Sequence, residues 1–194
     1  MIRRLCVFCG SNTGNRPVYR DAARSLGALL ARRKIGLVYG GGRVGLMGAL
    51  ADAVLEAGGE AIGVIPRALV EKEVGHRGLT ELRIVSSMHE RKAQMMDLAD
   101  AFIALPGGYG TLEEFCEVVT WLQLGLHRKP CGLLNVDGYY DPLIALFQHA
   151  QSEGFLHPVH FSLVLADSDP ERLLDLLGSS VVPHFDKWLS PSQS

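Results

Sequence analysis

The sequence predicts a doubly wound α/β fold, with a mostly or wholly parallel sheet and helices on both faces. Short apolar runs rich in Val, Ile and Leu alternate with longer segments of helical periodicity. The apolar runs are nearly continuous, which is typical of strands that helices cover on both sides. With 194 residues, 47% of them hydrophobic, the chain can build one large core.

Seven apolar runs are expected as strands, and six periodic segments as helices. Two of the helices are expected to start at Asp-Pro pairs, Asp141-Pro142 and Asp169-Pro170, which favour an N-cap followed by the first helical residue. We therefore expect both aspartates to be caps rather than catalysts. One domain is expected over residues 1–180, followed by a tail over 181–194. The strands are expected at 5–9, 35–40, 61–66, 82–86, 101–106, 131–136 and 161–166, and the helices at 17–33, 46–58, 88–99, 109–123, 139–154 and 169–177.

The charge balance argues against an extended nucleic-acid surface. Lys and Arg number 19 against 21 Asp and Glu, which gives a formal net charge of -2. The basic side chains could therefore neutralise few phosphates along a nucleic acid. A small anionic ligand remains compatible with this balance. The N-terminal residues lack the long apolar core of a signal peptide, and no run of 18 apolar residues follows. We expect a cytoplasmic protein with no membrane partner.

The cysteines and the paired histidines do not predict a metal site. Cys6 and Cys9 are three residues apart within an expected strand, so their side chains should lie on opposite faces. The four cysteines are expected to be small buried residues in a reducing cytoplasm. His157 and His160 have no second ligand pair at zinc-site spacing and are expected in a loop.

The first glycine-rich segment, YGGGRVGLMG, contains Gly40-x-Gly42-x-x-Gly45 between a strand and a helix. That spacing matches a dinucleotide-binding fingerprint. However, it follows the second expected strand rather than the first, and the next strand ends in Pro66-Arg67 instead of an acidic residue. We therefore favour a structural interpretation, in which the glycines let the turn pass close to a neighbouring segment. A dinucleotide-dependent oxidoreductase remains the weaker alternative.

The second glycine-rich segment, ALPGGYGTLEEF, predicts a cradle for one phosphate. Gly107, Gly108 and Gly110 permit positive φ and a close approach of backbone N–H groups to a ligand, and Thr111 brings a hydroxyl to the first helical turn. No Gly-Lys dipeptide occurs in the chain, so the segment is not a nucleotide triphosphate P-loop. A monophosphate fits better than ATP.

Helical geometry separates the two adjacent glutamates. At about 100° per residue from Thr111, Glu114 falls at about 300° within the apolar arc, and Glu113 near 200° on the polar side. The same geometry places Arg91 on the apolar stripe of the preceding helix. A buried charge needs a partner or a task. A purely structural ion pair between Arg91 and Glu114 stays open.

The segment MHERKAQMMDLADAFIALPGGYGTLEEF resembles the Lonely Guy family of cytokinin-activating enzymes, which carry PGGxGTxxE downstream of an Arg-Lys pair. CVFCGS and VYGGGRVGLMG extend the similarity over nearly the whole folded chain. The resemblance implies a Rossmann-like fold and a homodimer with active sites near the subunit interface. Family members have often been labelled lysine decarboxylases, but none of the five lysines lies in a recognisable pyridoxal phosphate site.

The resemblance also implies an activity and its residues. The expected enzyme is a phosphoribohydrolase that cleaves the N-glycosidic bond of cytokinin riboside 5'-monophosphates, with AMP as a further candidate substrate. It requires no metal or organic cofactor, and a non-catalytic nucleotide-binding protein is the remaining alternative. The catalytic pair would be Arg91 and Glu114, with Glu114 acting on the oxocarbenium-like sugar or on water and Arg91 orienting the nucleotide. The expected substrate-binding residues are Glu73, Lys92, Gly107, Gly108, Tyr109, Gly110, Thr111, Leu112, Glu113 and Thr120.

Overall fold

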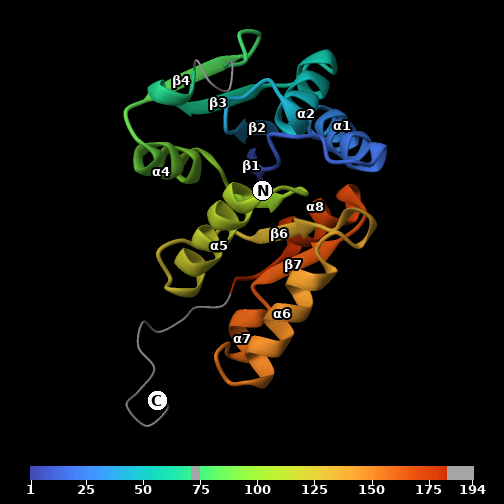
Figure 1. Cartoon of the computed structure of the whole chain (residues 1–194), viewed down its shortest axis with the longest axis vertical. Coiled ribbons are helices and arrows are strands. Elements are labelled where there is room, and N and C mark those ends of the chain that lie inside the picture. Colours follow the sequence, from blue (N-terminus) through green and yellow to red (C-terminus); the bar gives the residue numbers. More distant parts are fainter. Residues whose placement is uncertain (71–74, 183–194) are drawn as a thin grey trace.

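The computed structural model describes residues 1–70 and 75–182, and its centre is a single seven-stranded sheet (Figure 1). Every strand pair in this sheet is parallel, and the order is β4-β3-β2-β1-β5-β6-β7. The predicted doubly wound α/β class is confirmed. The strands are β1 (Arg4–Phe8), β2 (Gly36–Tyr39), β3 (Ala61–Pro66), β4 (Glu81–Val85), β5 (Ala101–Ala104), β6 (Cys131–Leu134) and β7 (Val164–Asp167).

Helices follow the strands along the chain, as the alternating pattern predicts. The six long helices begin and end within about three residues of the expected bounds. None of the helices in the described part of the chain is long and apolar enough to cross a membrane. The helical segments are α1 (Pro17–Arg32), α2 (Gly45–Glu56), α3 (Arg67–Val70), α4 (Met88–Leu98), α5 (Tyr109–Gln123), η1 (Val136–Gly138), α6 (Asp141–Ser152), α7 (Pro158–Phe161) and α8 (Pro170–Ser179).

The sheet separates two hydrophobic clusters because neighbouring residues of a strand face opposite sides. From β1, Leu5 and Val7 enter the cluster formed with α1, α2 and α8, whereas Cys6 and Phe8 enter the cluster formed with α4 and α5. Figure 1 shows α1 and α2 on one side of the sheet and α4 and α5 on the other. Cys9 packs against the first cluster, so the prediction that Cys6 and Cys9 lie on opposite faces is confirmed.

Around β7 the sequence-based expectation was wrong in detail. A strand was expected from residue 161, but the short helix α7 occupies Pro158–Phe161 and β7 starts at Val164. Pro158 is the first residue of this helix, a position that favours proline, and Nδ1 of His157 accepts a hydrogen bond of 3.3 Å from the backbone N–H of Val159. The histidines expected in a loop therefore cap and occupy a helix.

Two further expectations need correction. Asp169 is an N-cap as predicted, accepting from the backbone N–H of Arg172 at 2.8 Å. Asp141, in contrast, is the first residue of α6 and accepts from the side-chain amide of Asn135 at 2.7 Å. Cys116 is exposed on α5, so not all four cysteines are buried.

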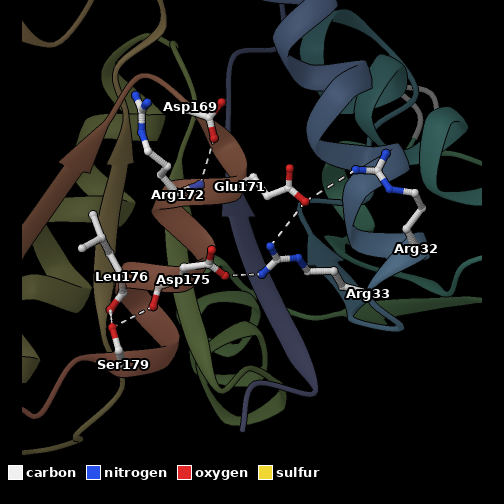
Figure 2. Close-up of polar contacts among 8 residues, drawn as sticks. All are labelled: Arg32, Arg33, Asp169, Glu171, Arg172, Asp175, Leu176 and Ser179. Atoms are coloured by element: carbon white, nitrogen blue, oxygen red, sulfur yellow. Dashed lines mark hydrogen bonds and ion pairs between the residues drawn. The ribbon is translucent and has the colours of Figure 1, made fainter.

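Ion pairs join the last helix, α8, to the end of α1 (Figure 2). The guanidinium of Arg33 pairs with Asp175 at 2.5 Å and with Glu171 at 3.4 Å. In the same helix, Leu173 is fully buried and lies against Gly132 of β6. Because exposed ion pairs add little stability, burial of the leucine face should hold the helix in place.

The contrast between exposed ion pairs and buried leucines predicts that substitutions of the two kinds lower the stability by different amounts. Leu173→Ala should lower the free energy of unfolding by about 2–5 kcal/mol, since it removes buried methyl groups and leaves a cavity. Asp175→Asn should cost about 1 kcal/mol or less, because the pair that it breaks is exposed. Urea denaturation measures the free energy of unfolding of both variants. If both lose a similar amount, the leucine face is not what mainly holds α8 in place.

Candidate active site

The site lies where the chain reverses its direction across the sheet. From β1 the chain proceeds to β2, β3 and β4 on one side, while β5 returns beside β1 and continues to β6 and β7 on the other. The loops after β1 and β5 meet at this switch point, where the N–H of Gly10 donates to the carbonyl of Pro106 at 3.1 Å. Ligands in open α/β sheets bind in such crevices.

A cavity of about 300 Å³ opens at this switch point. One wall is the loop after β1, and the other is the segment that leads from β5 into α5. Its lining residues are Gly10, Ser11, Asn12, Thr13, Gly14, Tyr19, Leu46, Pro106, Gly107, Gly108 and Tyr139.

The predicted phosphate cradle borders this cavity at the start of α5. Gly108 is the N-cap, and no side chain caps the helix, so its first N–H groups remain available to an anion. Gly107 allows a close approach: a Cβ there would overlap the Thr111 side chain and lie 2.9 Å from the backbone N of Gly10. None of Gly107, Gly108 and Gly110 uses the positive φ that glycine permits. Steric room, rather than left-handed backbone, explains the glycine at 107.

Arg91 and Glu114 meet beside this segment, as the helical geometry predicts. Both residues are 8% exposed, and Nη1 of Arg91 lies 3.5 Å from Oε1 of Glu114. Thr111 is also buried, one helical turn before Glu114 on the same face of α5. Glu113 is exposed, so the predicted difference between the two adjacent glutamates is confirmed.

Arg91 is positioned by the start of its own helix, by a hydrogen bond to β3 and by the close approach of Gly40. The start of α4 is capped by Ser87, whose Oγ accepts from the N–H of Glu90 at 3.1 Å. Nε of Arg91 donates to the carbonyl of Val64 in β3 at 3.2 Å. Gly40 directly follows β2, and a Cβ at this position would overlap the guanidinium of Arg91. The first glycine-rich segment thus makes room for Arg91, which agrees with the close-approach interpretation of its glycines.

The same segment also packs tightly against the loop after β1. Gly45 has φ +62°, and a Cβ there would overlap the backbone of Ser11. The N–H of Leu46 donates to the carbonyl of Gly10 at 3.0 Å. The glycine spacing that matches a dinucleotide fingerprint therefore serves backbone packing.

Lys92 forms a second bridge between α4 and α5. Its Nζ lies 2.6 Å from Oε1 of Glu113 and 3.0 Å from Oε1 of Glu117. Partial burial acts to lower the pKa of Lys92, but the hydrogen bonds that Lys92 donates to Glu113 and Glu117 outweigh burial and raise this pKa above its ordinary value. Lys92 is therefore a permanent cation at neutral pH. Glu117 was not among the residues predicted from the sequence.

Two cysteine thiols lie near the Arg91–Glu114 pair. Burial, followed by the negative charge of Glu114, raises the pKa of Cys6 and that of Cys9 well above the ordinary value of a thiol. Thiols with a raised pKa are poor nucleophiles at neutral pH. The described residues contain no group of three or more His, Cys, Asp or Glu placed to hold a metal ion. The buried carboxylate of Glu114 is the candidate acid–base group of the site.

The remaining predicted residues differ in their placement. Tyr109 is 94% exposed at the start of α5, next to the exposed Gly110, and Leu112 packs against the hydrophobic cluster below the helix. Thr120 lines a separate cavity between α5, α6 and α7, and its Oγ1 donates to the carbonyl of Cys116 at 2.7 Å. Glu73 lies outside the described residues.

The sequence reasoning missed the loop after β1 and Tyr139 as parts of the site. CVFCGS contributed only to the family resemblance, and Tyr139 lies 28 residues after Thr111 in the chain. The available signal was the position of each segment directly after a strand. Only the strand order, with β1 beside β5, brings them to one cavity.

The chain is similar to known proteins over most of its length. The family described as "Possible lysine decarboxylase" matches residues 47–177. The cytokinin riboside 5'-monophosphate phosphoribohydrolase LOG of Oryza sativa subsp. japonica is 58% identical over 188 residues, covering 96% of this chain and 77% of the relative. The corresponding Arabidopsis thaliana enzyme LOG7 is 50% identical over 188 residues, covering 97% and 86%.

A solved structure supports the fold independently. The molybdenum cofactor binding protein of Rippkaea orientalis superposes with a TM-score of 0.68 over 92% of this chain and 97% of its own. Its sequence identity is 23%, so this similarity bears on the fold alone. The family match and the identities of 50–58% over nearly the whole chain show that the chain belongs to the LOG family of cytokinin riboside 5'-monophosphate phosphoribohydrolases.

Proposed function

We propose that this protein hydrolyses the N-glycosidic bond of cytokinin riboside 5'-monophosphates, releasing an N6-substituted adenine and ribose 5-phosphate. The observation that carries the proposal is the buried Arg91–Glu114 pair next to an uncapped helix start, in a chain that shares 58% identity with an enzyme named for this activity. AMP, which has the same phosphate and ribose, is proposed as a further substrate.

The proposed chemistry follows from the charges that develop as the bond breaks. Positive charge builds on the ribose, and negative charge builds on the departing base. Glu114 offers a buried carboxylate that can stabilise the cationic sugar or take a proton from the attacking water. Arg91 is held in place by its hydrogen bond to the carbonyl of Val64. Its guanidinium can offset negative charge on the base or the phosphate. Burial strengthens both interactions because less water screens them.

The proposed substrate contacts divide into two groups. The helix start at Gly107, Gly108 and Thr111 would hold the 5'-phosphate, and Lys92 would add a positive charge nearby. Tyr109, Gly110, Leu112, Glu113, Thr120 and Glu73 remain proposed contacts on the strength of the family resemblance alone. The cytoplasmic location also stays a prediction, which cell fractionation would check.

One incubation tests the activity. Purified protein is mixed with isopentenyladenosine 5'-monophosphate or with AMP, and the products are separated by chromatography. Free base and ribose 5-phosphate in equal amounts are expected from at least the cytokinin nucleotide. Intact nucleotide that stays bound would instead favour a non-catalytic nucleotide-binding protein.

We further propose that the enzyme works as a homodimer through the faces of α5, α6 and α7. Large apolar side chains are exposed there, including Leu124, Leu126, Leu146 and Phe155 at 51%, 58%, 58% and 89%. Exposed large apolar side chains are candidates for a protein interface. A dimer would also account for Thr120, which family resemblance assigns to the nucleotide site although it lines another cavity in its own chain.

The assembly is tested by light scattering. The wild type should give twice the chain mass of 21.1 kDa. Phe155→Glu should give a monomer with reduced activity, because it puts a charge into the apolar face. Leu176→Glu, which alters an exposed leucine on α8, should remain dimeric. A fully active wild-type monomer would refute the proposal.

A further inference from the structure

A third loop, after β6, contacts both walls of the switch-point cavity. Its turn comprises residues 135–141 and includes η1. Asp137 and Gly138 have φ values of 52° and 73°, so the backbone turns through the left-handed region twice. Asn135 secures the turn: its Oδ1 accepts from the N–H of Tyr140 and its amide donates to Asp141, both at 2.7 Å. This turn is therefore a well-connected support.

Tyr139 contacts the wall that is formed by the segment from β5 into α5. Its hydroxyl donates to the carbonyl of Gly107 at 2.6 Å. Gly107 is the residue whose missing side chain lets the segment approach Gly10 and Thr111. A hydrogen bond to this carbonyl restrains the peptide that precedes the helix start, and thereby the direction of the N–H groups offered to an anion.

Contacts with the other wall come from Tyr139 and Asp137. The Tyr139 ring meets the Tyr19 ring edge to face, with centroids 5.8 Å apart, and Asp137 forms an ion pair with Arg16. Tyr19 in turn lies against Gly14, where a Cβ would be 2.8 Å from the ring. Arg16 and Gly14 belong to the segment between β1 and α1. One turn thus fixes the spacing between the two loops that bound the cavity.

From these contacts we infer that Tyr139 is a positioning residue for recognition of the substrate's 5'-phosphate. It acts through the Gly107 carbonyl and through Tyr19, and the group recognised is a phosphate monoester on a ribose. The inference rests on the proposed phosphoribohydrolase activity for its kinetic test, and a binding test that needs no turnover accompanies it.

The decisive variant is Tyr139→Phe, which keeps the ring contact with Tyr19 and removes the hydroxyl. KM for the nucleoside monophosphate should rise about 3- to 10-fold, the size of one lost hydrogen bond. Turnover at saturation and cleavage of the unphosphorylated riboside should change less than 2-fold, so that selectivity for the phosphate falls. The increase in melting temperature that ribose 5-phosphate produces should shrink by a corresponding amount.

Tyr140→Phe is the matched control. Tyr140 is 1% exposed, and its hydroxyl donates to the carbonyl of Leu105 at 2.6 Å, in the same segment after β5. It does not line the cavity. Its loss should lower the melting temperature without changing selectivity for the phosphate, because the bond lies inside the core. Comparison of the two variants separates positioning from general stability.

The possible results discriminate between the hypotheses. If the wild type cleaves the nucleotide and Tyr139→Phe retains its full selectivity and its full response to ribose 5-phosphate, the role of Tyr139 is refuted while the activity stands. If the wild type cleaves no nucleotide, the proposed activity fails, and the response to ribose 5-phosphate alone decides the role of Tyr139. A wild type whose melting temperature does not change with ribose 5-phosphate would refute the phosphate site itself.

Discussion

Replacing Glu114 with Gln should reduce turnover by about 100- to 1,000-fold, the usual effect of losing an electrostatic group that acts in the transition state. The substitution keeps the shape of the side chain and removes the charge that faces the developing cationic sugar. Substrate binding should survive. Arg91→Ala should be nearly as damaging, and the double variant should be little worse than either single one if the two residues act as a unit.

Glu113→Gln is the comparison within the same helical turn. Its carboxylate is exposed, and Lys92 retains Glu117 when Glu113 loses its charge. Its turnover should therefore change only modestly. The measurement is turnover per folded protein, alongside melting temperatures. If the Arg91–Glu114 pair is only structural, each variant loses stability while its folded fraction stays active; equal activity of the Glu113 and Glu114 variants would eliminate the catalytic assignment.

The second large effect concerns the 5'-phosphate. A nucleoside monophosphate should be cleaved at least about 100-fold more efficiently than its riboside, because charge-assisted hydrogen bonds contribute about 1.5–3 kcal/mol each and the helix start can supply two. Gly107→Ala should remove most of this advantage. The new Cβ would lie 2.9 Å from the backbone of Gly10 and overlap Thr111, so the segment must move. A displacement of about 1 Å can cost about 100-fold in rate.

Gly178→Ala is the control for the introduction of a methyl group. Gly178 lies in α8, where a Cβ would meet nothing within 4 Å. Its kcat/KM for both substrates should match the wild type. A riboside cleaved as efficiently as its monophosphate by the wild type would show that the segment from Gly107 to Thr111 does not hold a phosphate.

The fold was predictable because its signals are local. Apolar runs between helical segments, as in AIGVIP at residues 61–66, report strands buried on both faces, and the observed strand β3 has the same bounds. The error near His157 and Pro158 arose where a short helix replaces the start of a predicted strand. A segment of four residues is too short for periodicity to distinguish the two.

The orientation of the charged side chains was also predictable. Glu114 and Arg91 face inward because each helix turns by a constant angle per residue, so an apolar stripe in the sequence identifies the buried face. Their burial at 8% each follows from that periodicity. The sequence therefore determined the fold class, the two inward charges and the glycine-rich helix start.

Tertiary structure alone decided which of these features meet. Three contacts depend on the order of the strands in the sheet: the 3.5 Å contact between Arg91 and Glu114, the space that Gly40 leaves for the guanidinium, and the hydrogen bond from Tyr139 to Gly107. Strand order follows from the summed packing of both sheet faces, and no local pattern encodes it. Residues far apart in the chain therefore become neighbours only when the whole sheet forms.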